Sequence, residues 1–212
     1  MVKQEGYMKI LARLLRGGQF EEVERFLLSN SNLPGPRGNL QLAAAFADSV
    51  RSDSVRGDSV RGDSIRSDSI RDDGVQVSAA GPLWDRLNRW GSISAEDAPT
   101  GSPAEFLPFC AIQALSVLYV HAGFSDRERV VGMLEAAAAD VRWRMREATA
   151  MALQRIAEAD FEMAKAVLDR WMARPTPVLE RAIVAALAHP PILHESLRVA
   201  YCLQVSDRIT MT

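Results

Sequence analysis

Apolar and polar positions follow the period of an α-helix along most of the chain. In the stretch 8–15, Met8, Leu11, Ala12 and Leu15 recur at spacings of three and four, which places them on one helical face. No stretch alternates convincingly with period two, so we expect no sheet and an all-α fold. The same spacing, with the Gly and Pro positions, predicts helices over about 8–15, 19–30, 39–48, 82–90, 105–122, 126–139, 141–158, 161–174, 177–188 and 194–206.

Several of these helices are preceded by residues that cap helix N-termini. A side-chain oxygen at that position accepts a hydrogen bond from a free backbone N–H of the first turn. Such caps are expected at Asn39, at Ser125 or Asp126, at Asp140 and at Asp160.

A pattern of two small residues four apart, followed by Leu, recurs in three of the expected helices. Small residues on one face let a neighbouring helix approach closely. A single helical pair cannot bury such a face, whereas stacked pairs can. The copies lie about 38 and then about 34 residues apart: Cys110, Ala114 and Leu115; Ala148, Ala152 and Leu153; Ala182, Ala186 and Leu187.

The stretch 140–171, DVRWRMREATAMALQRIAEADFEMAKAVLDRW, resembles one helical pair of the HEAT/armadillo-like α-solenoids. The resemblance covers about 105–206 and extends more loosely to the N-terminal helices. It implies a right-handed α-α superhelix of stacked hairpins, with one exposed face as a recognition surface. An ordinary helical bundle without repeats is the alternative.

Five copies of Asp-Ser-[Val/Ile]-Arg-x run from Asp48 to Asp72. On a helix, a period of five turns the Val/Ile position by about 140° per copy, so no apolar stripe forms. A pentapeptide β-solenoid is disfavoured because Asp58, Asp63 and their equivalents occupy a position that this fold keeps small and apolar. We therefore expect a disordered or weakly helical insert, whose first copy extends the preceding helix. The predicted organisation is N-terminal helices over 1–47, the insert over 48–79 and HEAT-like repeats over 80–212.

The tract spells Arg-Gly-Asp-Ser twice, at Arg56–Ser59 and Arg61–Ser64. Animal cell-adhesion receptors bind this tetrapeptide. Both copies, however, arise automatically when Asp-Ser-Val-Arg-Gly is repeated, so the motif does not indicate adhesion.

Composition and charge narrow the class of protein. Of 212 residues, 48% are hydrophobic and 25% charged, with a net charge of −2, so no overall positive field favours nucleic acid or an anionic membrane. The apolar stretch 106–123 contains Pro108, Gln113, Ser116 and His121, which favours a buried helix over a membrane span. No signal peptide is recognisable, and we expect a cytoplasmic protein in which Cys110 and Cys202 are buried thiols.

The densest group of candidate binding residues lies in DVRWRMREA. An exposed Trp among several Arg is typical of a surface that anchors a partner protein or contacts phosphates. We favour the alternative, in which the Trp packs against the preceding helix while the arginines pair with Asp140, Glu147 and Glu158. The candidate residues are Arg142, Trp143, Arg144, Arg146 and Arg155.

The predicted function is a non-catalytic scaffold that binds an unidentified protein partner. The histidines are scattered, and neither a phosphate-binding Gly loop nor a nucleophile elbow is present, so we expect no catalytic residues, metal or cofactor. The terminal helix, with Leu203 and Val205, could also dock a second copy.

The alternative function is DNA binding. The basic helix resembles the DNA alkylation-repeat glycosylases, which act on damaged bases. That resemblance implies roles for Trp84, Asp85 and Trp90.

Overall fold

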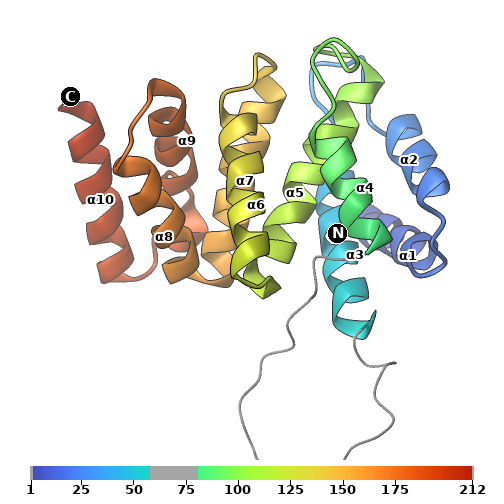
Figure 1. The fold of residues 1–212 in the computed structure, drawn as a ribbon, viewed down its shortest axis with the longest axis horizontal. Coiled ribbons are helices and arrows are strands. Elements are labelled where there is room, and N and C mark those ends of the chain that lie inside the picture. The colour runs from blue at the N-terminus through green and yellow to red at the C-terminus, as the bar shows by residue number, and fades with distance from the viewer. Residues whose placement is uncertain (1, 58–80, 212) are drawn as a thin grey trace, which may run out of the picture.

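The computed structural model describes residues 2–57 and 81–211 (Figure 1), and within these ranges it contains helices and no strand. The all-α prediction is confirmed for this part of the chain. Short 3-10 helices, η2 (Pro103–Glu105) and η3 (Pro190–Ile192), precede α5 and α10. The α-helices are α1 (Val2–Arg16), α2 (Phe20–Ser29), α3 (Leu40–Gly57), α4 (Pro82–Gly91), α5 (Phe106–His121), α6 (Phe124–Ala138), α7 (Trp143–Ala159), α8 (Phe161–Met172), α9 (Pro177–Leu187) and α10 (Ser196–Thr210).

The helices form two layers. The odd-numbered helices α1, α3, α5, α7 and α9 contact one another in chain order. The even-numbered helices pack on them: α2 on α1 and α5, α4 on α5, α6 on α5 and α7, α8 on α7 and α9, and α10 on α9. Figure 1 shows the result as a row, with α1 and α2 at one end and α10 at the other. The N-terminal helices therefore belong to the same array as the rest.

The small residues of the repeated pattern are buried, as expected. Each is 3% exposed or less: Cys110, Ala114, Ala148, Ala152, Ala182 and Ala186. Two glutamines add a polar link between neighbours. Gln113 of α5 donates to the Ala148 carbonyl at 3.0 Å, and Gln154 of α7 donates to the Ala185 carbonyl at 2.9 Å. Close approach of the backbones thus brings a side-chain donor within reach of the next helix.

Helix α5 is the most apolar element. The stretch Pro103–His121 is long and apolar enough to cross a membrane by length and composition, with a mean hydropathy of 1.4, but 83% of that window is buried inside the protein. Helices α3, α4, α6 and α7 cover it. The expectation of a buried core helix is confirmed, and Cys110 within it is fully buried, which raises the pKa of its thiol.

Local signals set several helix ends. Asn39 caps α3 through the Leu42 amide at 3.1 Å, and Asp160 caps α8 through the Met163 amide at 3.1 Å, as predicted. The predictions of caps at Ser125 or Asp126 and at Asp140 are wrong, because α6 begins after Gly123 and α7 begins after Arg142, in each case with no capping side chain.

The pentapeptide tract begins inside a helix. Helix α3 continues to Gly57, so the first copy extends it as predicted, and the second copy, which we expected in the insert, is helical too. Ser49 and Val50 of the first copy are fully buried. The remaining copies, including both Arg-Gly-Asp-Ser sequences in part or whole, lie outside the described residues.

Enlarging a small residue between α5 and α7 should destabilise the fold. We expect Ala148→Leu to lower the free energy of unfolding by roughly 1–3 kcal/mol, because the added methylenes force two closely packed helices apart. Urea unfolding followed by circular dichroism measures this change. The control Ala136→Leu, at an exposed position of α6, should change it by less than about 0.5 kcal/mol. Equal effects of the two substitutions would contradict the close helix contact.

Candidate binding site

The side chain of Arg142 is buried at the turn between α6 and α7, with 2% exposure. Its guanidinium pairs with both carboxylate oxygens of Asp140, at 2.9 and 2.6 Å. It also donates to three backbone carbonyls of the loop after α4, those of Ile93 (2.9 Å), Ser94 (3.2 Å) and Ala98 (3.1 Å). This one side chain therefore holds a loop without regular secondary structure against the start of α7.

Arg144 forms a second buried link one residue into α7. Its guanidinium lies 2.8 Å from the carboxylate of Glu105, which is fully buried, and 3.1 Å from the carbonyl of Gly35. Glu105 also accepts the Gly101 amide at 2.7 Å. The guanidinium carbon of Arg144 lies 4.7 Å from the centroid of the Trp143 ring, a cation–π contact. The start of α7 is thus tied to the start of α5 and to the loop between α2 and α3.

The other two arginines of the candidate group also bond within the protein. Arg146 donates to the backbone carbonyls of Asp140 (2.7 Å) and Val141 (3.0 Å). Arg155 lies near the opposite end of α7 and pairs with Asp48 of α3 at 2.7 Å.

The structure therefore does not bring the five candidate residues together on one exposed surface. Arg142 and Arg144 are buried, because Arg142 donates to Asp140 and three loop carbonyls and Arg144 pairs with the buried carboxylate of Glu105. Trp143, 44% exposed, is the most open of the group. That these residues bind a partner stays a prediction: Arg142, Trp143, Arg144, Arg146 and Arg155.

The expectation that the arginines of this helix pair with Asp140, Glu147 and Glu158 is confirmed for Asp140 alone. Asp140 pairs with Arg142 as expected. Glu147 pairs instead with Arg181 of α9, and Glu158 with His189. Each of these contacts links α7 with the next part of the chain.

The tryptophans of α4 are also buried. Trp84 is 4% exposed beneath the guanidinium of Arg129, and Trp90 is 2% exposed with its indole N–H 3.2 Å from Glu24. Neither ring offers a free face on which a nucleic acid base could stack, which is the role that the glycosylase resemblance implied for them.

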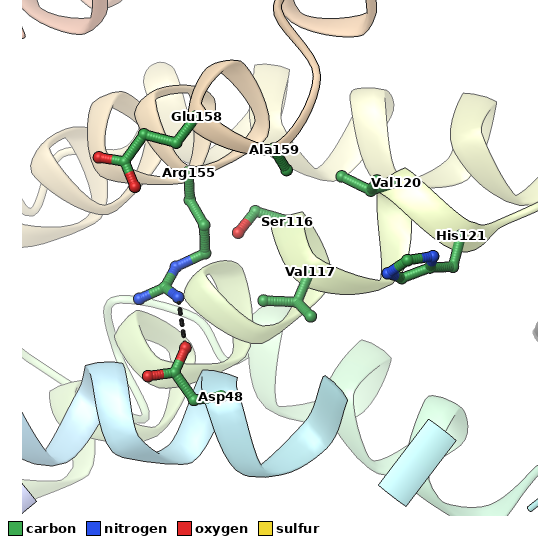
Figure 2. A pocket seen from close by; sticks show the side chains of 8 residues that line it. All are labelled: Asp48, Ser116, Val117, Val120, His121, Arg155, Glu158 and Ala159. Carbon is green, nitrogen blue, oxygen red and sulfur yellow. Dashed lines mark hydrogen bonds and ion pairs between the residues drawn. The ribbon is translucent and has the colours of Figure 1, made fainter. Parts of the chain in front are cut away.

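A pocket of about 550 Å³ opens between three odd-numbered helices, α3, α5 and α7. Figure 2 shows Arg155 extending from α7 toward Asp48 of α3, with Val117 of α5 beside the pair. The lining combines apolar and polar groups: Asp48, Ser116, Val117, Val120, His121, Arg155, Glu158 and Ala159. It suits an amphipathic ligand, because apolar walls favour burial while the charged groups orient what is bound.

The sequence gives no sign of this pocket. Its walls come from residues 48, 116–121 and 155–159, which share no motif and meet only because α3, α5 and α7 pack side by side. Arg155 was a candidate through its position on a basic helix, but its neighbours at the pocket were not foreseen.

Within the described residues, no group of three or more His, Cys, Asp or Glu side chains is arranged to hold a metal ion. Comparison of the chain with known protein families, with characterised proteins and with solved structures found no match in any of the three.

Removing the buried guanidinium of Arg142 should destabilise the protein strongly. We expect Arg142→Gln to cost about 3–5 kcal/mol of unfolding free energy, because Asp140 and the loop carbonyls lose their donors inside the protein. Arg142→Lys should lose less unfolding free energy than Arg142→Gln, since the ammonium keeps the charge but lacks the planar set of donors of a guanidinium. Urea unfolding provides the measurement, and Arg174→Gln, at an exposed position, is the control. A loss no larger than that of the control would refute the structural role of Arg142.

The Arg142–Asp140 pair should also make stability depend on acid pH. Burial alone would raise the pKa of Asp140, but the hydrogen bonds from the side chain and amide of Arg142 outweigh it and leave the pKa below its ordinary value. The stabilisation is therefore present above the unfolded pKa of about 3.9 and is lost as the pH falls through the folded pKa. We expect the gap in unfolding free energy between wild type and Asp140→Asn to narrow between about pH 5 and about pH 2.

Urea unfolding at a series of pH values tests this. Glu96→Gln, at an exposed position of the loop, should follow the wild type throughout. A gap between wild type and Asp140→Asn that stays constant with pH would show that this carboxylate is not the titrating group.

Proposed function

We propose that this protein is a non-catalytic helical-repeat scaffold of the HEAT/armadillo type. In this proposal, successive helical pairs stack as a right-handed superhelix, and an extended segment of a partner protein lies across the odd-numbered helices. The pocket between α3, α5 and α7 receives one side chain of that segment.

The observation that carries the proposal is the composition and position of this pocket. Three successive helices of one layer contribute to it, so it belongs to the array rather than to a single loop. Its volume of about 550 Å³ lies within the range of roughly 300–1,000 Å³ found for ligand sites. Apolar side chains, Val117 and Val120, stand beside charged ones, which is the pattern of a surface that binds an amphipathic segment.

The charges of the pocket favour a protein partner over DNA. Two carboxylates, Asp48 and Glu158, line it with one guanidinium, that of Arg155. Because DNA-binding surfaces gather several cations to neutralise phosphates, this balance would repel a DNA backbone. The burial of Arg142 and Arg144 removes two further cations that a DNA-binding surface would use.

Selection of random peptides displayed on phage against the full chain tests the proposal. We expect selected peptides to bind wild type at least about tenfold more tightly than the Ala159→Trp variant, because the new indole fills the pocket. Residue 159 is exposed, so the substitution does not disturb the core. Fluorescence anisotropy of the labelled peptides measures the dissociation constants.

The control Ala136→Trp places the same side chain on an exposed position of α6, in the other layer, and should leave the affinities unchanged. The proposal is wrong if no peptide is enriched. It is also wrong if duplex DNA binds with a steep dependence on salt, which is the behaviour of the alternative.

A further inference from the structure

A second pocket, of about 440 Å³, adjoins the first along the array. It lies between the turn from α7 to α8 and the N-terminal half of α10, and it shares Glu158 and Ala159 with the first pocket. Its lining is Glu158, Ala159, Asp160, Phe161, Glu162, Lys165, Glu195, Leu197, Arg198 and Tyr201. The two pockets adjoin at these shared residues, and we call the two pockets together the α3–α10 groove.

Two aromatic rings of the second pocket each hold a cation of the protein itself. The Lys165 ammonium lies 5.0 Å from the centroid of Tyr201, and the Arg198 guanidinium lies 5.1 Å from the centroid of Phe161. The two rings meet edge to face, with centroids 5.8 Å apart. Aromatic faces attract cations through their negative quadrupole, so this pocket already has the surroundings in which cations are stable.

The two internal cations do not neutralise the pocket. Lys165 is hydrogen-bonded to Asp169 at 2.6 Å, a contact that raises the pKa of its ammonium, and Arg198 pairs with Glu195 at 2.9 Å. The exposed carboxylate of Glu162 stands on the same turn of α8 as Lys165, one residue after Phe161.

The balance of charge in the lining is therefore negative. Four carboxylates face the second pocket against two cations: Glu158, Asp160, Glu162 and Glu195 against Lys165 and Arg198. Including the first pocket adds Asp48 and Arg155, which leaves the excess of carboxylates unchanged. A ligand that crosses both pockets meets Val117 and Val120 beside charged groups at one end and a negative, aromatic pocket at the other.

We propose that the α3–α10 groove binds an extended basic segment of a partner protein, with an arginine or lysine side chain in the second pocket and an apolar side chain in the first. This inference rests on the proposed function and specifies its ligand. Carboxylates at the rim accept charge-assisted hydrogen bonds from the guanidinium or ammonium, while Tyr201 and Phe161, which already hold Lys165 and Arg198, supply apolar contact for the aliphatic part of the side chain. An acidic segment would be repelled by the same carboxylates.

Three fluorescein-labelled peptides of equal length test the inference on the full chain. In each, Leu alternates with one other residue, which is Arg, Gln or Glu. By fluorescence anisotropy we expect the Arg peptide to bind at least about tenfold more tightly than the Gln peptide, and the Glu peptide to bind most weakly. The affinity of the Arg peptide should fall as salt is added, because the carboxylates of the groove are solvent-exposed.

A matched pair of variants separates the groove from general attraction between opposite charges. Glu158→Gln combined with Glu162→Gln should weaken the Arg peptide roughly fivefold. Glu5→Gln combined with Glu96→Gln removes the same charge from exposed positions of α1 and of the loop after α4, and should leave the affinity unchanged.

The inference is overturned if the Arg peptide fails to bind, if the Gln or Glu peptide binds equally well, or if both double variants act alike. Its failure differs from failure of the proposed function. Suppose that selected peptides without basic residues bind wild type and no longer bind the Ala159→Trp variant. That result would support the scaffold proposal and reject only the basic ligand.

Discussion

The buried pairing of arginine with carboxylate at the start of α7 is the constraint on which the rest of the array depends. Arg142 with Asp140, and Arg144 with Glu105, fasten the loop after α4 and the start of α5 to α7. Neither pair need contribute much net stability, because removing two charges from water is costly. Their importance lies in specificity: once the charges are buried, any other arrangement leaves them unpaired, so the register of α5 against α7 is fixed.

This use of arginine also decides the character of the surface. A helix that begins WRMR suggests a positive patch, yet its cations are directed inward or paired with carbonyls and carboxylates of their own chain. The two pockets, one between α3, α5 and α7 and the other beside α8 and α10, together carry more carboxylates than cations. The same contacts that hold the loop in place therefore bury Arg142 and Arg144, so these two cations are not displayed on the surface.

The regular part of the fold was predictable because its signals are local. The helical period, the Gly and Pro positions and the caps at Asn39 and Asp160 act within a few residues, and the structure follows them. The small residues of the repeated pattern were correctly predicted to be buried. The start of α6 was missed because Ser125 and Asp126 offer plausible caps, and a local signal alone cannot show that the helix begins earlier, after Gly123.

From the sequence alone, the helices and several of their ends could be predicted, but α1 begins at Val2 rather than at residue 8, and α3 continues through the second pentapeptide copy to Gly57. The position of each charged side chain was set by the packing of helices in three dimensions. Arg142, Arg144 and Arg155 all fall on one predicted basic helix, but one meets loop carbonyls, one a buried glutamate and one an aspartate from a helix far away in the chain. The physical reason is the distance over which each signal acts. Hydrophobic period and capping depend on residues within one or two turns, whereas a long, flexible arginine side chain pairs with whatever acceptor the packing of distant helices brings beside it.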